Sequence, residues 1–312
     1  LGPLLGPSLG GWLVQVASWH WIFLINVPVG LVGLLASLRF MPHLRADSPP
    51  PLDMPGYLLL ALGMVALSLG LESLGQRWQL GLTWCAVGAA SLALYLAHAR
   101  RCQAPLFGPH LWRIASLRIG LWGNLLSRLG STSMPFLVPL LLQVGLGYSP
   151  LQAGLWLLPM VAAGMAVKTL AVPLVRRWGY RRVLVGNTLA LGLGMVSFVW
   201  LTAEQPLAWR LLQLAWFGAA NSLQFSAMNT VTLQELDGST ASSGNSLLSM
   251  VQMLALGMGV ALAGGLLAAF AGGHTEGAQV LPAFQATFVC MGLLTMAASA
   301  IFARLPHSPQ AG

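Results

Sequence analysis

The most constraining feature of the sequence is a series of long apolar runs that follow one another with only short polar breaks. A helix rises about 1.5 Å per residue, so about 20 apolar residues cross the roughly 30 Å hydrocarbon core of a bilayer. We therefore expect an all-α polytopic membrane protein with about ten transmembrane helices. The runs are 1–17, 21–40, 56–71, 80–99, 119–146, 151–175, 183–203, 207–234, 246–272 and 278–302.

The composition excludes an ordinary water-soluble domain. Only 7% of the 312 residues are charged, whereas a soluble domain carries roughly 25%. The formal net charge of +8 does not indicate nucleic-acid binding, because the bases lie between apolar runs, and we expect the lipid bilayer as the partner. The three cysteines lie far apart and show no metal-ligand spacing, so we expect neither a disulfide framework nor a metal site.

Basic residues are distributed unevenly between the two sets of alternating loops. One set holds only Arg77 and Arg210, and the positive-inside rule places the other, richer set in the cytoplasm. The richer set comprises Arg39, Arg45, Arg100, Arg101, Arg113, Arg118, Arg176, Arg177, Arg181, Arg182 and Arg304.

The polar breaks divide the chain into blocks. A proline-rich stretch predicts a cytoplasmic linker, and a stretch that alternates bases with Phe107, Leu111 and Trp112 predicts an amphipathic segment on the inner membrane surface. The predicted blocks are the last two helices of an amino-terminal bundle (1–40), the linker (41–55), two inserted helices (56–99), the amphipathic linker (100–118), a six-helix carboxyl-terminal bundle (119–304) and a cytoplasmic tail (305–312).

Local motifs support this layout. The opening GPLLGPSLGG places Gly2, Gly6 and Gly10 four residues apart, on one helix face that another backbone can approach closely. Together with Pro7 and Gly11, these glycines resemble the later part of the antiporter motif in the fifth helix of drug:proton antiporters of the major facilitator superfamily. The stretches SWHWIFLINVPVG, GYRRVLV, FSAMNT and SSGNSLLSM extend the resemblance to the 14-span subfamily over nearly the whole chain.

The resemblance implies a proton-coupled efflux transporter of small hydrophobic or cationic drugs, which works by alternating access as a multi-pass protein of the bacterial inner membrane. Its partners would be a small-molecule substrate and protons, with the proton gradient as the energy source and no cofactor. Because the chain begins inside the motif, we expect the first helices, and with them the coupling carboxylate, to be missing.

Three alternatives accompany this interpretation. The chain could belong to an exporter of a metabolite or siderophore, or be a transport-inactive partial chain. A polytopic membrane enzyme is disfavoured, because the acids and histidines fall in loops or at helix ends instead of clustering at membrane depth.

Arg128 is the residue of the predicted spans that most disfavours membrane insertion, since an arginine near a helix centre raises the insertion free energy by roughly 2.5 to 3.5 kcal/mol. Polar residues recur around it at spacings of three and four and predict one stripe that faces a watered cavity. Snorkelling of Arg128 to the cytoplasmic surface is the alternative. The stripe contains Asn124, Arg128, Ser131, Thr132 and Gln143, together with Pro135 and Pro139.

Further cavity candidates are Lys168, Asn221, Gln224 and Gln252. Lys168 lies seven residues from the cytoplasmic end of its run, where snorkelling is also possible. Interhelical hydrogen bonds explain such buried amides as well as substrate contact does.

The basic loop RRWGYRR resembles the family's cytoplasmic gating loop at Arg177, Gly179, Arg181 and Arg182. Arg176 departs from the pattern, because the family usually has an acid or amide at that position. A third adjacent cation cannot form the same pairing, so a loop that only fixes topology is favoured over a gating latch.

Overall fold

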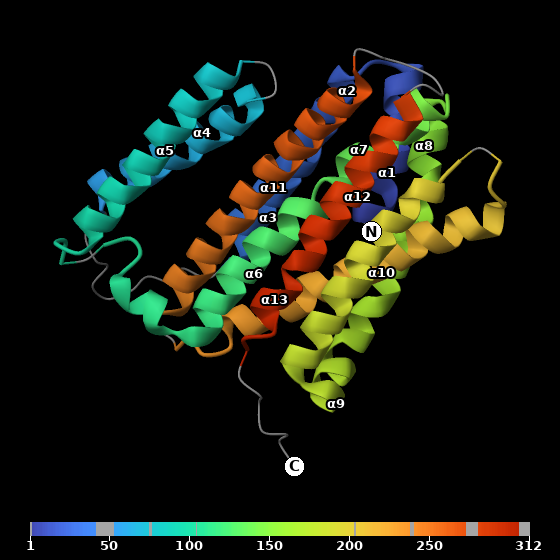
Figure 1. Ribbon diagram of the computed structural model, residues 1–312. Helices are drawn as coiled ribbons and strands as arrows, with labels where there is room; N and C mark the ends of the chain where they lie inside the picture. The colour runs from blue at the N-terminus through green and yellow to red at the C-terminus, as the bar shows by residue number, and fades with distance from the viewer. Residues whose placement is uncertain are drawn as a thin grey trace.

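The computed structural model describes residues 2–41, 53–74, 77–103, 105–202, 204–237, 240–272 and 280–305. In these ranges the regular structure is helical, without a strand. Figure 1 shows long helices lying side by side, with one helical hairpin at the edge of the bundle. The expected all-α fold is confirmed.

The first block consists of α1 (Gly2–Val16), α2 (His20–Leu24) and α3 (Asn26–Phe40). α1 packs against α8 (Pro150–Trp156) of the carboxyl-terminal block. Neither α2 nor α3 has a buried side chain, although both are strongly apolar. Of the predicted linker 41–55, residues 42–52 lie outside the described ranges.

The inserted hairpin comprises α4 (Met54–Leu74) and α5 (Trp78–Ala99), which lie against each other, with α4 also packed along α11 (Ala241–Ala271) (Figure 1). Gly88 allows close approach of the two helices, since a Cβ there would lie 2.9 Å from the backbone nitrogen of Leu67. α4 begins two residues before the predicted run, and Asp53 immediately precedes it.

The segment after the hairpin differs from the amphipathic surface segment that the sequence predicted. Between Ala99 and Ala115, the described residues form only a short 3-10 helix, Pro109–Arg113, and Phe107 and Leu111 are buried. They pack in one cluster with Leu60 of α4 and Leu247 of α11 instead of facing lipid. The apolar side chains of this segment therefore attach the inserted hairpin to the bundle.

The first span of the carboxyl-terminal block is interrupted. It consists of α6 (Ala115–Ser131), α7 (Met134–Leu140) and a π-helical turn (Leu141–Gly145). Pro135 and Pro139 lack the backbone N–H that a regular helix needs, which accounts for the break and for the wide turn that follows. α6 begins four residues before the predicted run.

The next helices are α8, which begins with a capping box between Ser149 and Gln152, and α9 (Leu158–Ser197). α9 consists of two arms that meet at Gly179, whose φ of 75° is accessible to glycine at little cost. A 3-10 turn (Phe198–Trp200), α10 (Leu207–Leu233), α11, α12 (Leu281–Ala297) and α13 (Ser299–Phe302) complete the block. Its interior is a cluster of aliphatic and aromatic side chains that includes Met134, Phe198, Phe217, Phe284 and Phe288.

By length and composition, seven helical segments of the described chain could cross a membrane. Fewer segments than the ten predicted runs qualify because Pro150–Trp200 covers two runs, α1 has only 15 residues, and amide side chains make α10 more polar. The seven are His20–Phe40, Met54–Ser73, Trp78–Ala99, Ala115–Gly145, Pro150–Trp200, Ala241–Ala271 and Leu281–Phe302.

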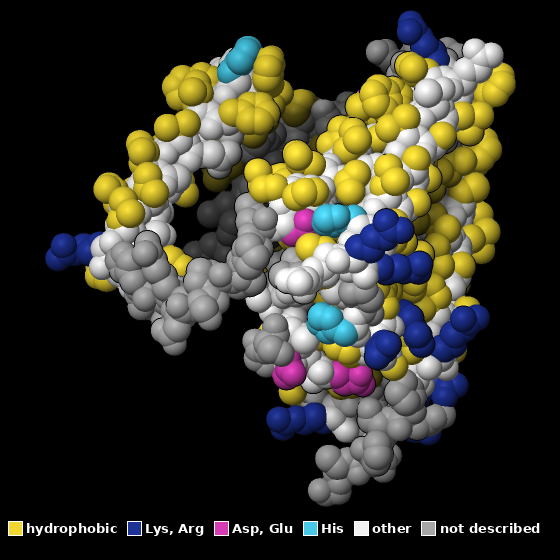
Figure 2. Space-filling view, turned by 90° about the vertical axis from the view of Figure 1, so that its left-hand side faces the viewer, with side chains coloured by type: hydrophobic (Ala, Val, Ile, Leu, Met, Phe, Trp, Pro, Cys, Tyr) yellow, Lys and Arg dark blue, Asp and Glu magenta, His cyan; other side chains and the backbone are white. Residues whose placement is uncertain are grey.

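The surface is that of a membrane protein. In Figure 2 the upper part of the visible face is largely hydrophobic, and most of its Lys and Arg side chains gather in the lower part. Aliphatic and aromatic side chains are widely exposed, for example Val29 and Phe40 of α3. Such a surface needs lipid or another apolar partner to cover it.

Candidate functional site

Arg128 lies deep in its span. It is the fourteenth residue of α6, which places it about 20 Å along the helix axis from Ala115. The span Ala115–Gly145 has 31 residues, so Arg128 lies close to its middle. The earlier start of α6 makes this position deeper than the sequence predicted.

A buried amide holds the side chain of Arg128. The arginine Nε donates a hydrogen bond of 3.2 Å to Oδ1 of Asn124, one turn earlier on α6. Asn124 is fully buried, and its Nδ2 donates to the carbonyl of Gly120 at 3.0 Å and to Oγ1 of Thr232 on α10 at 3.4 Å. The orientation of Arg128 therefore depends on the contact between α6 and α10.

The guanidinium of Arg128 also contacts an aromatic ring, and its Nη2 forms no hydrogen bond within the described chain. Its central carbon lies 4.5 Å from the ring centre of Phe225 on α10, a cation–π geometry. Nη2 is buried without a hydrogen-bond partner in the described chain, and no ion pair of Arg128 occurs there. A buried cation with an unused donor is suited to an anion, a carbonyl or water.

Phe225 belongs to a face of α10 on which it alternates with two amide residues at intervals of four positions. Asn221, Phe225 and Asn229 share this face, and Phe225 is 44% exposed. Gln252 of α11 joins it, because its Nε2 donates to Oδ1 of Asn229 at 2.8 Å. We call Arg128, Phe225, Asn229 and Gln252, which come from three helices, the Arg128 face.

The structure corrects the single polar stripe predicted on this span. Asn124 and Ser131 are buried between helices, and the hydroxyl of Thr132 donates to the carbonyls of Arg128 and Ala255. Gln143 is exposed and donates to the carbonyl of Pro139 on its own turn. Gln143 lies beyond the break between α6 and α7, which interrupts the helical register on which the stripe depended. Asn124 and Ser131 precede the break and are buried because other helices pack against α6.

Gln224 has a structural role, which corrects its assignment to the cavity. It is 1% exposed, and its amide bridges α10 to the second arm of α9. Its Oε1 accepts a hydrogen bond from Asn187 and its Nε2 donates to Thr188, both at 2.7 Å.

The two predicted basic sites both lie on α9, which packs against α10 and α6, the helices that carry Phe225 and Arg128. Lys168 is exposed on the first arm of α9. Gly179 forms the bend between the arms, Arg177 and Arg182 beside it are exposed, and Arg181 is half-buried. This bend lies at the position of the predicted loop.

The glycine motif makes its close contact at a different position from the one predicted. A Cβ on Gly6 or Gly10 would meet nothing within 4 Å, whereas a Cβ on Gly11 would lie 2.5 Å from the carbonyl oxygen of Pro150. Gly11 lies about 100° around the helix from Gly10, so a different face of α1 meets α8. The surroundings of Gly2 and Pro7 lie outside the description.

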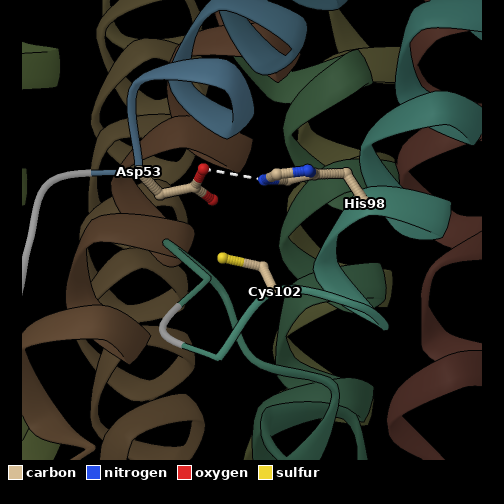
Figure 3. Close-up of side chains that lie close together, drawn as sticks. All are labelled: Asp53, His98 and Cys102. Atoms are coloured by element: carbon tan, nitrogen blue, oxygen red, sulfur yellow. Dashed lines mark hydrogen bonds and ion pairs between the residues drawn. The ribbon is translucent and has the colours of Figure 1, made fainter.

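A second cluster of functional side chains was missed in the sequence. Asp53, His98 and Cys102 each offer one ligand atom, and these atoms lie within 4.8 Å of one another (Figure 3). The spacing of four between His98 and Cys102 was an available signal. Asp53 could not be found in this way, because it lies 45 residues before His98.

Asp53 is held in place by three hydrogen bonds. Its Oδ1 accepts from the backbone nitrogen of Gly56 at 2.9 Å and lies 2.8 Å from Nε2 of His98, and its Oδ2 accepts from the backbone nitrogen of Leu106 at 3.3 Å. Burial raises the pKa of the Asp53 carboxyl, but these hydrogen bonds and the charge of His98 outweigh burial and leave the pKa below its usual value. The carboxylate is thus ionised at neutral pH.

Known proteins match the chain over most of its length. The family model described as Major Facilitator Superfamily matches residues 1–260. Curated proteins of Salmonella paratyphi A, Salmonella heidelberg and Salmonella typhi, each named "Putative multidrug resistance protein MdtD", are 45% identical to it over 99% of the chain and 67% of their own length. The chain is thus a membrane protein that belongs to the major facilitator superfamily.

Proposed function

We propose that the chain acts in a proton-coupled antiporter that exports small hydrophobic or cationic drugs across the bacterial inner membrane by alternating access. Family membership and the multidrug-resistance name of the Salmonella relatives support export of drugs. They also support a transporter over an enzyme. Alternating access needs two bundles that rock about a site between them, and the six-helix block supplies one of the two.

The observation that carries the proposal is the Arg128 face. Arg128 lies near the middle of its span with an unused buried donor, and the exposed Phe225 ring lies beside it. A cation at this depth persists only where water, a dipole or an anion compensates its charge. We propose that the compensation comes from a watered central cavity and from an acid on the other bundle, whose protonation couples the proton gradient to transport.

The aromatic part of the same face suits hydrophobic substrates. Phe225 offers an apolar surface, while Asn229 and Gln252 offer amides that can adapt to different partners. Once Arg128 is paired with an acid, it does not repel a cationic drug.

A second candidate is an exporter of a metabolite or siderophore that carries an acidic group. The unpaired Nη2 of Arg128 favours it, because a guanidinium binds carboxylates and phosphates with two parallel hydrogen bonds. In this alternative the substrate, and not a protein acid, compensates the charge.

Transport by the full-length protein tests both candidates. In cells that lack their main exporters, expression should lower the accumulation of hydrophobic dyes, and a protonophore should abolish the effect. Drug-resistance profiles and export of a panel of acidic metabolites separate the two substrate classes. Export that survives the protonophore, in protein reconstituted with and without a pH gradient, contradicts proton coupling.

A further inference from the structure

We propose that Asp53, His98 and Cys102 bind a divalent transition-metal ion of the Zn²⁺ class where the inserted hairpin meets the segment that follows it. We call these three residues the junction site. It lies at the end of the inserted hairpin where α4 begins and α5 ends. The inference is independent of what the protein transports.

The three ligand atoms are already close to a coordinating arrangement. Zinc binds sulfur at about 2.3 Å and nitrogen or oxygen at about 2.0 to 2.2 Å, which puts the ligand atoms of a tetrahedral site roughly 3.3 to 3.7 Å apart. In the junction site all three lie within 4.8 Å of one another. Oδ1 of Asp53 and Nε2 of His98, now 2.8 Å apart, would have to separate by roughly 0.5 Å, and the thiol of Cys102 would have to approach them by about 1 Å. Side-chain rotation can supply shifts of this size.

The backbone around the junction site positions each ligand. His98 lies in the last turn of α5, and the backbone nitrogen of Cys102 donates to its carbonyl at 2.9 Å, which places both side chains on one side of this turn. The carboxylate of Asp53 is fixed by the backbone nitrogens of Gly56 and Leu106. The ligands are thus held by local structure in the absence of an ion.

A purely structural ion pair accounts for the positions of Asp53 and His98, but not for that of Cys102. Asp53 caps the start of α4 and pairs with His98, whose side chain is 29% exposed. This leaves the thiol of Cys102 without a reason to point at the pair, as Figure 3 shows it does. A cysteine–histidine–acid relay does not account for it either, because its thiol and acid contact opposite ring nitrogens, whereas here both lie at the same end of the imidazole (Figure 3).

The ligand chemistry selects the metal. Thiolate and imidazole ligands favour Zn²⁺ and similar ions over Mg²⁺ and Ca²⁺, which prefer oxygen. On binding, Cys102 releases its thiol proton to solvent, and Nε2 of His98 gives up the proton that it donates to Asp53, which passes to Nδ1 in a neutral imidazole or to solvent from a protonated one. The ion then replaces the hydrogen bond between His98 and Asp53. One carboxylate, one thiolate and a neutral imidazole balance the 2+ charge.

An ion at this position would tie three segments together. It would join the start of α4, the end of α5 and the segment whose Phe107 and Leu111 attach the hairpin to the bundle. Three protein ligands leave a fourth position for water, which is typical of exchangeable and not of purely structural zinc sites.

Cadmium titration of the purified full-length protein tests the proposal. Cys102 is kept as the only cysteine, and the ultraviolet charge-transfer band between thiolate and Cd²⁺ reports binding. We expect one saturable site that Zn²⁺ competes for and Mg²⁺ does not. Asp53→Asn and His98→Asn should each weaken Cd²⁺ binding at least about tenfold, and Cys102→Ser should abolish the band.

A protein that keeps only Cys85, which lies within α5 away from the other two ligands, is the matched control and should show no saturable site. Zn²⁺ should also protect Cys102 from maleimide in otherwise unsubstituted protein, a readout that does not require the Asp53 and His98 variants to fold. Equal Cd²⁺ affinity in folded Asp53→Asn, His98→Asn and parent proteins would show a lone thiol, and the proposal would be wrong. Absence of both the band and the protection would overturn it as well.

Discussion

The guanidinium carbon of Arg128 on α6 lies 4.5 Å from the ring centre of Phe225 on α10. The pair joins two helices at the depth where a charge is most costly in a bilayer. Asn124 supports the pair from within α6, while Phe225 remains 44% exposed. Arg128 is consequently held in place beside an exposed ring, and its own side chain is only partly buried.

Removal of the Arg128 charge should separate membrane insertion from transport. Arg128→Ala should insert normally, because loss of the charge favours the bilayer, and should reduce proton-coupled efflux at least about tenfold. Arg128→Lys should recover only part of the activity, since an ammonium lacks the planar fork of donors. The measurement is the efflux rate per amount of membrane-inserted protein.

Arg39→Ala is the matched control, because it removes an exposed charge in the last turn of α3, far along the chain from the Arg128 face. Its efflux should stay close to that of the parent protein. Full efflux by Arg128→Ala would mean that the residue has no part in transport.

Phe225→Leu should weaken transport moderately. A cation–π contact at a partly exposed site contributes roughly 0.5 to 1 kcal/mol, which corresponds to about a two- to fivefold effect. Phe270→Leu on α11 changes an equally exposed ring that has no cation in contact in the described chain, and should leave transport unchanged. Equal efflux rates for the two variants would contradict a role for the Arg128–Phe225 contact.

Gly11 and Gly10 should respond differently to the same substitution. Gly11→Ala places a methyl group 2.5 Å from the carbonyl oxygen of Pro150, so α1 and α8 must separate, at a cost of roughly 1 to 3 kcal/mol. Gly10→Ala meets nothing and should stabilise α1 by up to about 1 kcal/mol. Thermal unfolding in detergent measures both, and a lower midpoint for Gly10→Ala than for Gly11→Ala would refute the assigned contact.

Gln224 should matter for stability and not for transport. Gln224→Leu removes hydrogen bonds to Asn187 and Thr188, and we expect a loss of about 0.6 to 1.7 kcal/mol. Efflux per folded protein should be preserved. Gln252→Ala, on the Arg128 face, should show the opposite behaviour, with an altered range of exported compounds and a smaller change in stability.

Thiol labelling tests the orientation in the membrane. The positive-inside rule places Cys102, beside Arg100 and Arg101, in the cytoplasm. An impermeant maleimide should therefore reach Cys102 only in inverted vesicles, and a cysteine at the exposed Glu204 only in intact cells. Gly147 is less suitable for a cysteine because its φ of 72° disfavours side chains. Labelling of Cys102 in intact cells would reverse the topology.

The sequence by itself determined the helical fold and the approximate position of each helix. This was possible because the signals are local: a bilayer needs about 20 apolar residues per helix, and glycine and proline change the backbone where they occur. The bend at Gly179 and the unusual position of Arg128 follow directly from such signals. The glycine motif also placed α1 in a close contact, although not at the correct glycine.

Only the tertiary structure decided which polar residues share a site. Gln224 turns to Asn187 of α9, and Phe225, the next residue, faces Arg128, because the packing of α10 against its neighbours directs the two side chains differently. Asp53 meets His98 because α4 and α5 lie against each other. Such contacts depend on how helices distant in sequence pack, and helical periodicity within one segment carries no information about the segment that covers it.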